Sequence, residues 1–169
     1  ISSTATDKTY IYSNNTHNNN YTFCVYPNVV PTLLVTSEVF QYSHSVSGTY
    51  PQRTSTFINQ TYTNSSVTNT TFYLLDVNHG LTSTYQVITI GNTVIPGVHI
   101  TVQRNISGNT VLVGEGDTDS AGTTTFFLNP NYLHTFTVSK TGYATQIQIL
   151  KPTQSFYTFT MGTGTSPFY

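Results

Sequence analysis

Charged residues are scarce in this chain, and their scarcity excludes several functions. Lys, Arg, Asp and Glu together make up 7% of its 169 residues, whereas typical soluble domains carry roughly a quarter. With five Lys and Arg and a net charge of −1, the chain lacks the basic surface that binding to nucleic acid needs. Ser, Thr, Asn and Tyr take the place of charge, so neutral hydroxyl and amide groups, or attached glycans, must keep the surface solvated.

Cysteine is also nearly absent. Cys24 is the single cysteine, which excludes an internal disulfide, and we expect it to be a buried, unreactive thiol in a strand. The alternative is a disulfide between two copies. No apolar run reaches the ~18 residues of a membrane-spanning helix, and no signal peptide is visible. Because Ile1 is not an initiator residue, we expect a mature form whose leader was removed.

Helical patterns are missing as well. Alanine occurs only at positions 5, 121 and 144, and no segment shows a helical period. Thr, Tyr, Phe and Val, which are abundant, favour strands, and the 37% hydrophobic content argues against disorder. We therefore predict an all-β chain built from two small β-sandwich modules. The expected strands are residues 21–26, 33–42, 54–62, 67–77, 83–90, 98–103, 111–113, 125–128, 134–139, 145–150 and 155–161.

The second half of the chain carries the clearest alternation of apolar and polar residues. Val98, Ile100 and Val102 point to one side of a strand, and His99 points to the other with its polar neighbours. Polar turns at residues 107–109, 117–122 and 140–143 separate the strands that follow. We expect His99 and His134 to be exposed on the polar side. The predicted buried core consists of Val98, Ile100, Val102, Phe126, Phe136 and Val138.

Three short motifs in this half support a family resemblance. They are IPGV at residues 95–98, TDSAG at 118–122 before Phe126, and FTVSKTGY at 136–143. In this order they resemble the prealbumin-like or Cna B-type (carboxypeptidase-regulatory-like) domains. The resemblance implies a seven-stranded sandwich over residues 87–162, of a kind that serves mostly as stalk, spacer or adhesion module. Residues 163–169 are expected to form a C-terminal tail.

The family's internal Lys–Asn cross-link is not expected here. The resemblance would place its Lys on the first strand and its Asn on the last. Residues 94–102 contain no Lys, and residues 155–161 contain no Asn. An intermolecular link through Lys8 remains as an alternative.

The first half is expected to form an incomplete immunoglobulin-like β-sandwich over residues 21–86. It has about six strands, whereas that fold needs about seven strands and 100 residues. A missing strand leaves unpaired backbone groups and an open apolar groove. The nearest segment that could fill such a groove is residues 4–12, a predicted strand that the Asn-rich linker 13–20 separates from the body. Residues 1–20 are therefore interpreted as a donor strand with its linker.

No pattern in the sequence predicts catalysis or metal binding. The five His have no metal-ligand spacing, and no nucleophile elbow or phosphate loop is present. Glu115, Asp117 and Asp119 form an acidic turn without the order of a calcium loop. We expect no enzyme activity, no catalytic residue, no cofactor and no metal. N-glycosylation sequons are present in a number that the composition gives by chance, at Asn14, Asn20, Asn59, Asn64, Asn69 and Asn105.

These observations favour a structural role outside the cell. The composition and the separate N-terminal strand resemble subunits of archaeal donor-strand filaments, the threads and bundling pili. We expect a glycosylated extracellular filament, a homopolymer whose copies join head to tail through Thr9, Tyr10, Ile11 and Tyr12. The alternative is an adhesion or carbohydrate-binding module that contacts sugar or a surface. A stalk domain trimmed from a secreted enzyme is the third interpretation.

Overall fold

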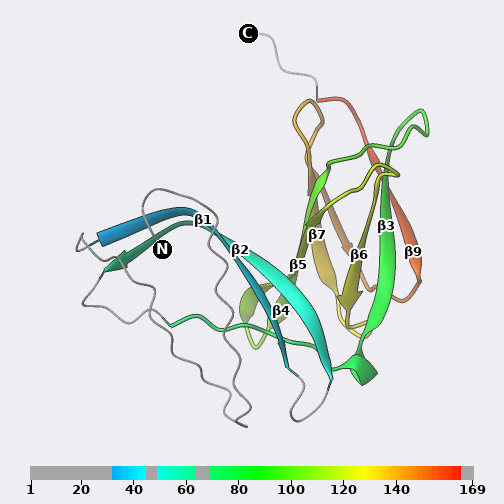
Figure 1. The fold of residues 1–169 in the computed structure, drawn as a ribbon. Helices are drawn as coiled ribbons and strands as arrows, with labels where there is room; N and C mark the ends of the chain where they lie inside the picture. Colours follow the sequence, from blue (N-terminus) through cyan, green and yellow to red (C-terminus); the bar gives the residue numbers. More distant parts are fainter. Residues whose placement is uncertain (1–31, 45–48, 64–68, 165–169) are drawn as a thin grey trace.

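The computed structural model describes residues 32–44, 49–63 and 69–164, and it confirms the all-β prediction (Figure 1). Within these ranges the only helix is the short 3-10 turn η1 (Val77–His79). No helix in the part of the chain described here is long and apolar enough to span a membrane. The strands are β1 (Thr32–His44), β2 (Tyr50–Thr63), β3 (Leu81–Thr89), β4 (His99–Ile106), β5 (Asn109–Asp117), β6 (Thr123–Leu128), β7 (His134–Ser139), β8 (Gln146–Leu150) and β9 (Phe156–Met161).

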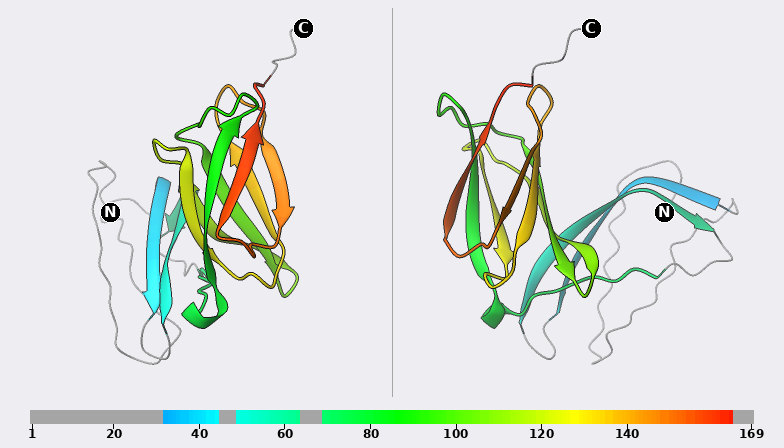
Figure 2. Two further views of the ribbon diagram at one scale, coloured as in Figure 1. Left: turned by 90° about the vertical axis from the view of Figure 1, so that its right-hand side faces the viewer. Right: turned by 180° about the vertical axis from the view of Figure 1, so that it is seen from behind.

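Strands β3 to β9 form two facing sheets (Figure 2). One sheet has the order β6-β3-β9 and the other β5-β4-β7-β8. Neighbours are antiparallel except for β3 and β9, which run parallel. These seven strands are the number that the resemblance to prealbumin-like domains implies. The expected boundary between residues 86 and 87 falls inside β3, whose neighbours among the described strands are β6 and β9, so the sandwich includes β3 from Leu81 onward.

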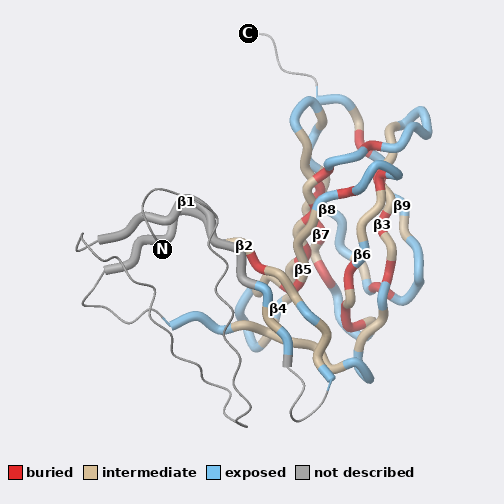
Figure 3. The backbone as a smooth tube through the Cα atoms, in the orientation of Figure 1, coloured by how far each residue is buried: buried red, intermediate tan, exposed pale blue. Residues whose placement is uncertain are grey.

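The core lies between the two sheets (Figure 3). All six residues predicted for it are buried, including Phe136 at 0% exposure and Phe126 at 7%. The prediction succeeded because alternation along β4 and β7 places every second side chain on the inner face. Tyr85 on β3 adds a ring that lies 4.8 Å from Phe136 and 5.6 Å from Phe126, centroid to centroid. An aromatic cluster therefore joins the two sheets.

His134 contradicts the sequence prediction, because it is buried with only 1% exposure. It shares the inner face of β7 with Phe136 and Val138, as the strict alternation of this strand requires. Burial is tolerated because the ring is neutral and its Nδ1 lies 2.9 Å from the carbonyl oxygen of Tyr132. Burial lowers the pKa of His134 to about 4. His99 lies on the outer face with its side chain 45% exposed.

The loop before β6 is held by one buried threonine. Thr118 Oγ1 donates to the carbonyl of Ile95 at 2.8 Å and accepts from the amide of Val98 at 2.9 Å. Gly122 closes the same loop at φ +71°, where a Cβ would lie 2.9 Å from the carbonyl oxygen of Val87. Only glycine tolerates this combination of dihedral and contact. The TDSAG motif therefore holds the loop between β5 and β6 against the segment that leads into β4.

The structure describes only part of the first module. The strands of the described part form the antiparallel hairpin β1–β2, which packs beside β5 at one end and extends away from the sandwich at the other (Figure 1). The strand expected over residues 21–26 lies outside the described residues. The strand expected over 67–77 is wrong for residues 69–76, which form no ladder. Individual hydrogen bonds hold this segment instead. Arg53 Nη1 donates to the carbonyl of Tyr73 at 2.8 Å, and the amide of Val77 donates to the carbonyl of Thr49 at 2.8 Å.

Candidate functional site

The two lateral sides of the sandwich differ in how they are covered. At one side, β2 packs beside β5, and the amide of Thr56 donates to Glu115 Oε2 at 3.0 Å. Arg53 Nη2 also donates to the carbonyl of Phe127 at 3.3 Å. At the other side, β8 and β9 end their sheets, and within the described residues no strand pairs with their outer edges. Among the residues that the structure describes, the second side is therefore the one open to an added strand.

Strand β8 presents an apolar outer surface at this open edge. Its pairing with β7 sets Ile147 opposite Thr137 and Ile149 opposite Thr135. Both isoleucines are 64% exposed. Gln148, which lies opposite the buried Phe136 and hence on the inner face, is exposed too. Isoleucines alternating along an unpaired edge are a liability unless another chain covers them.

The predicted donor and glycan residues are only partly within the described ranges. Thr9, Tyr10, Ile11 and Tyr12 lie outside them, as do Asn14, Asn20 and Asn64. Asn59 lies in β2. Asn69 and Asn105 are exposed. Asn105 Oδ1 accepts from the backbone amide of Gly108 at 3.0 Å. A glycan would be attached to the other side-chain atom, Nδ2 of Asn105.

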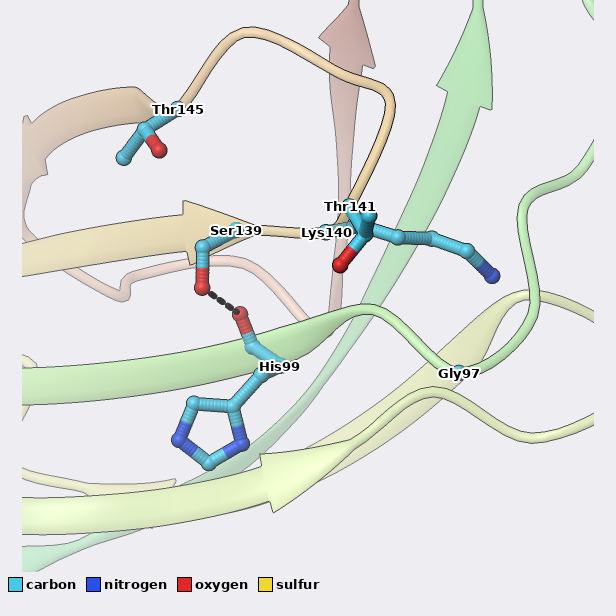
Figure 4. A pocket seen from close by; sticks show the side chains of 6 residues that line it. All are labelled: Gly97, His99, Ser139, Lys140, Thr141 and Thr145. Carbon is cyan, nitrogen blue, oxygen red and sulfur yellow. Dashed lines mark hydrogen bonds between the residues drawn. The ribbon is translucent and has the colours of Figure 1, made fainter.

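A shallow hollow of about 520 Å³ lies at the end of β7 (Figure 4). Its lining carries hydroxyl groups, one ammonium and one imidazole. Ser139 Oγ donates to the backbone carbonyl of His99 at 3.5 Å, not to the ring. Lys140 Nζ donates to the carbonyl of Pro96. The lining residues are Gly97, His99, Ser139, Lys140, Thr141 and Thr145.

The imidazole of His99 faces two carboxylates across β4 and β5. Its Nδ1 lies 2.8 Å from Asp117 Oδ1, and its Nε2 lies 3.5 Å from Glu115 Oε1. With both ring nitrogens directed at carboxylates, the ring is not positioned to take a proton from Ser139. The arrangement links two strands on the outer face of the sheet.

Asp119 is hydrogen-bonded within its own turn. Its Oδ1 accepts from the amides of Ala121 at 2.9 Å and Thr123 at 2.8 Å. The hydrogen bond from the Thr123 amide, together with those from the Thr123 hydroxyl and the Ala121 amide, lowers the pKa of the Asp119 carboxyl. The carboxylate thus organises its own loop. Across residues 32–44, 49–63 and 69–164, no three His, Cys, Asp or Glu side chains are grouped to hold a metal ion.

Comparison with known proteins identifies no family. No protein-family model matches the chain, and no curated protein resembles it in sequence. Among solved structures, a Streptococcal ancillary pilin is 13% identical with a TM-score of 0.42, over 78% of this chain and 44% of that one. A 9R-lipoxygenase from Cyanothece PCC8801 is 20% identical with a TM-score of 0.34, over 61% of this chain and 19% of that one. The chain spans less than half of either structure, and both likenesses are too distant to carry a function.

One group of polar residues could not be found from the sequence. Arg53 on β2, Arg104 on β4 and His134 on β7 line one cavity of about 210 Å³ between the hairpin and the sandwich. The two arginines are the only ones in the chain. The single available signal was their rarity in a sequence so poor in charge, and nothing in their spacing predicts that they meet.

Proposed function

We propose that this chain is a structural subunit of a glycosylated extracellular filament, in which each copy donates its N-terminal strand to the next. The open edge of the sandwich at β8, with Ile147 and Ile149 exposed, is the observation that carries the proposal. The chain acts on no substrate in this role and needs no cofactor. Its partner is another copy of itself.

The donor segment suits this edge in length and pattern. Residues 4–12 are longer than the five residues of β8. In an added strand, Tyr10 and Tyr12 fall on one face and Ile11 on the other. With the tyrosines outward they lie beside Ile147 and Ile149, where aromatic and β-branched side chains stabilise cross-strand pairing.

The linker allows the strand to reach a neighbour. Residues 13–20 span about 27 Å when extended, at 3.3–3.6 Å per residue. A contact between the N-terminal strand of one copy and the open edge of the next joins two different surfaces and is therefore heterologous. Its repetition gives an open filament unless the rotation closes a ring. Such a contact, repeated, would give the head-to-tail assembly that we propose.

Glycans complete the proposal because the surface lacks charge. A filament surface with 7% charged residues needs other solvated groups to prevent lateral association. Asn69 and Asn105 are exposed and open to modification, and the other four sequons extend the candidate set. Intact-mass measurement of native material should exceed the 18.7 kDa of the polypeptide. A bare polypeptide mass would remove glycosylation from the proposal.

Deletion of residues 1–12 tests strand donation. Electron microscopy should show filaments for the full chain and monomers for the deletion variant, and a synthetic peptide of residues 1–12 should stabilise those monomers by mass action. Ile149→Lys should block assembly at the edge, whereas Thr137→Lys, on the same outer face but on an inner strand, serves as the matched control.

Two outcomes separate the parts of this proposal. Filaments of normal appearance from the deletion variant would refute N-terminal donation and turn attention to residues 163–169. Monodisperse particles from the full chain that bind oligosaccharides would favour the adhesion or carbohydrate-binding module instead.

A further inference from the structure

The cavity between the hairpin and the sandwich is unusual in its charge. Its lining brings together segments from β2, β4, β5 and the start of β7, with the irregular segment at residues 73–75. Arg53 and Arg104 are both part of that lining, and no acidic residue is. In a chain with five basic residues in total, two of them therefore line one small cavity.

Among the residues that the structure describes, neither arginine has a carboxylate partner. The ion pairs of the described residues all involve histidine. Arg53 donates instead to the carbonyls of Tyr73 and Phe127, at 2.8 and 3.3 Å. Burial is the main cause that lowers the pKa of Arg53, and the charge of Arg104 acts in the same direction. Two partly buried cations that repel each other are costly unless a negative charge joins them.

Arg104 retains hydrogen-bonding capacity that the protein does not use. Its guanidinium carbon lies 3.7 Å above the centre of the Tyr132 ring, and this contact orients the guanidinium plane. Its Nε is buried and has no hydrogen-bond partner among the described residues. A buried donor without a partner costs roughly 1–3 kcal/mol. A planar, pre-oriented guanidinium with a free donor is the group that proteins use to bind oxyanions.

From this geometry we propose that the cavity binds a small oxyanion, a carboxylate or a phosphate, between Arg53 and Arg104. The anion neutralises both guanidinium groups by accepting from their N–H groups. It also fixes the hairpin against the sandwich, because Arg53 belongs to β2 and Arg104 to β4. This inference is independent of filament assembly, since the cavity lies at the covered side of the sandwich and not at the open edge.

Titration with sodium phosphate or sodium acetate tests the site, with sodium chloride at matched ionic strength to remove general screening. We expect a saturable rise in the melting temperature with phosphate or acetate. In NMR spectra the Nε–H resonance of Arg104 should shift along the same binding curve. The pKa of His134 should rise on binding, because the charges of both arginines contribute to lowering it.

Variants distinguish this site from a general effect of positive charge. Arg104→Gln should weaken binding about tenfold or more, and Arg104→Lys should weaken it as well, since lysine lacks the Nε donor and the planar fork. Lys151→Gln removes the same charge from an exposed position and should leave binding unchanged.

The proposal fails if neither anion shifts the Arg104 Nε–H resonance of the wild-type chain beyond the chloride control. It fails equally if Lys151→Gln weakens binding as much as Arg104→Gln does. The resonance measurement needs no variant, so a destabilised Arg104 variant would not leave the question open.

Discussion

Replacing Phe136 by alanine tests the packing of the sandwich most directly. The side chain is fully buried, at 0% exposure. Its ring lies 4.8 Å from that of Tyr85 and 5.5 Å from that of Phe159, and it pairs across the sheet with Val102. Both sheets therefore contribute to its surroundings, and truncation leaves a cavity that neither sheet can fill by itself.

The expected cost is about 3–5 kcal/mol of unfolding free energy, the range for a fully buried phenylalanine. For a domain of this size, each kcal/mol corresponds to roughly 4–8 °C in melting temperature, so the midpoint should fall by at least about 12 °C. The assay is urea unfolding followed by circular dichroism, with tyrosine fluorescence as a second probe because the chain contains no tryptophan. An unchanged denaturant slope would show that the loss is one of stability.

Ile149→Ala is the matched control. Ile149 is 64% exposed on the outer face of β8, so in the monomer its truncation should change stability by less than about 0.5 kcal/mol. If Phe136→Ala also cost less than about 0.5 kcal/mol, the inner and outer faces of β7 would have been exchanged, and the described core would be wrong.

Three further changes test other parts of the structure. Thr118→Val removes the hydroxyl that bonds Ile95 and Val98, so the unfolding free energy should fall by about 1–3 kcal/mol; an unchanged urea midpoint would contradict this. Tyr85→Phe removes a buried hydroxyl that makes no well-formed hydrogen bond within the described residues, because the neighbouring Ser83 hydroxyl donates to the carbonyl of Gln154 instead. This change should raise the urea midpoint, whereas a clear loss would show that the Tyr85 hydroxyl is hydrogen-bonded. The pKa of His134 is lowered from 6.5 to about 4, so the unfolded chain binds the proton more readily than the folded chain does. The unfolding free energy should therefore fall as the pH is lowered from 6.5 to about 4. His134→Gln should flatten this slope, and equal slopes would refute it.

Local pattern was sufficient for most of the sandwich. Alternation at Val98, Ile100 and Val102 identified a strand and its buried face, because a strand has a side-chain period of two. The turns at residues 107–109 and 140–143 were visible for the same local reason, since glycine marks positive φ at Gly108 and Gly142. The same period, applied to β7, would have placed His134 inside with Phe136. The error came from treating histidine as polar when a neutral ring with one satisfied nitrogen can be buried.

Which strands pair with one another could not be predicted from local pattern. The boundary expected after residue 86 divides the strand expected over 83–90, yet β3 lies whole at the centre of a sheet between β6 and β9. Its parallel neighbour β9 is far away in the sequence, and the alternation of one strand does not specify which strand will bond to it. Residues 69–76 show the converse, since their composition favours a strand but they pair with no strand among the described residues.

The sequence by itself determined the all-β class, the turns and the inner face of the sandwich, because these depend on the conformational preferences and periodicity of neighbouring residues. Tertiary structure alone decided which edges stay open and which side chains meet. Ile147 and Ile149 look like ordinary strand residues until β8 is found at the end of its sheet. Arg53 and Arg104 are 51 positions apart, and they share a cavity only because the hairpin folds against β5. Long-range packing brings such groups together, and no local signal records it.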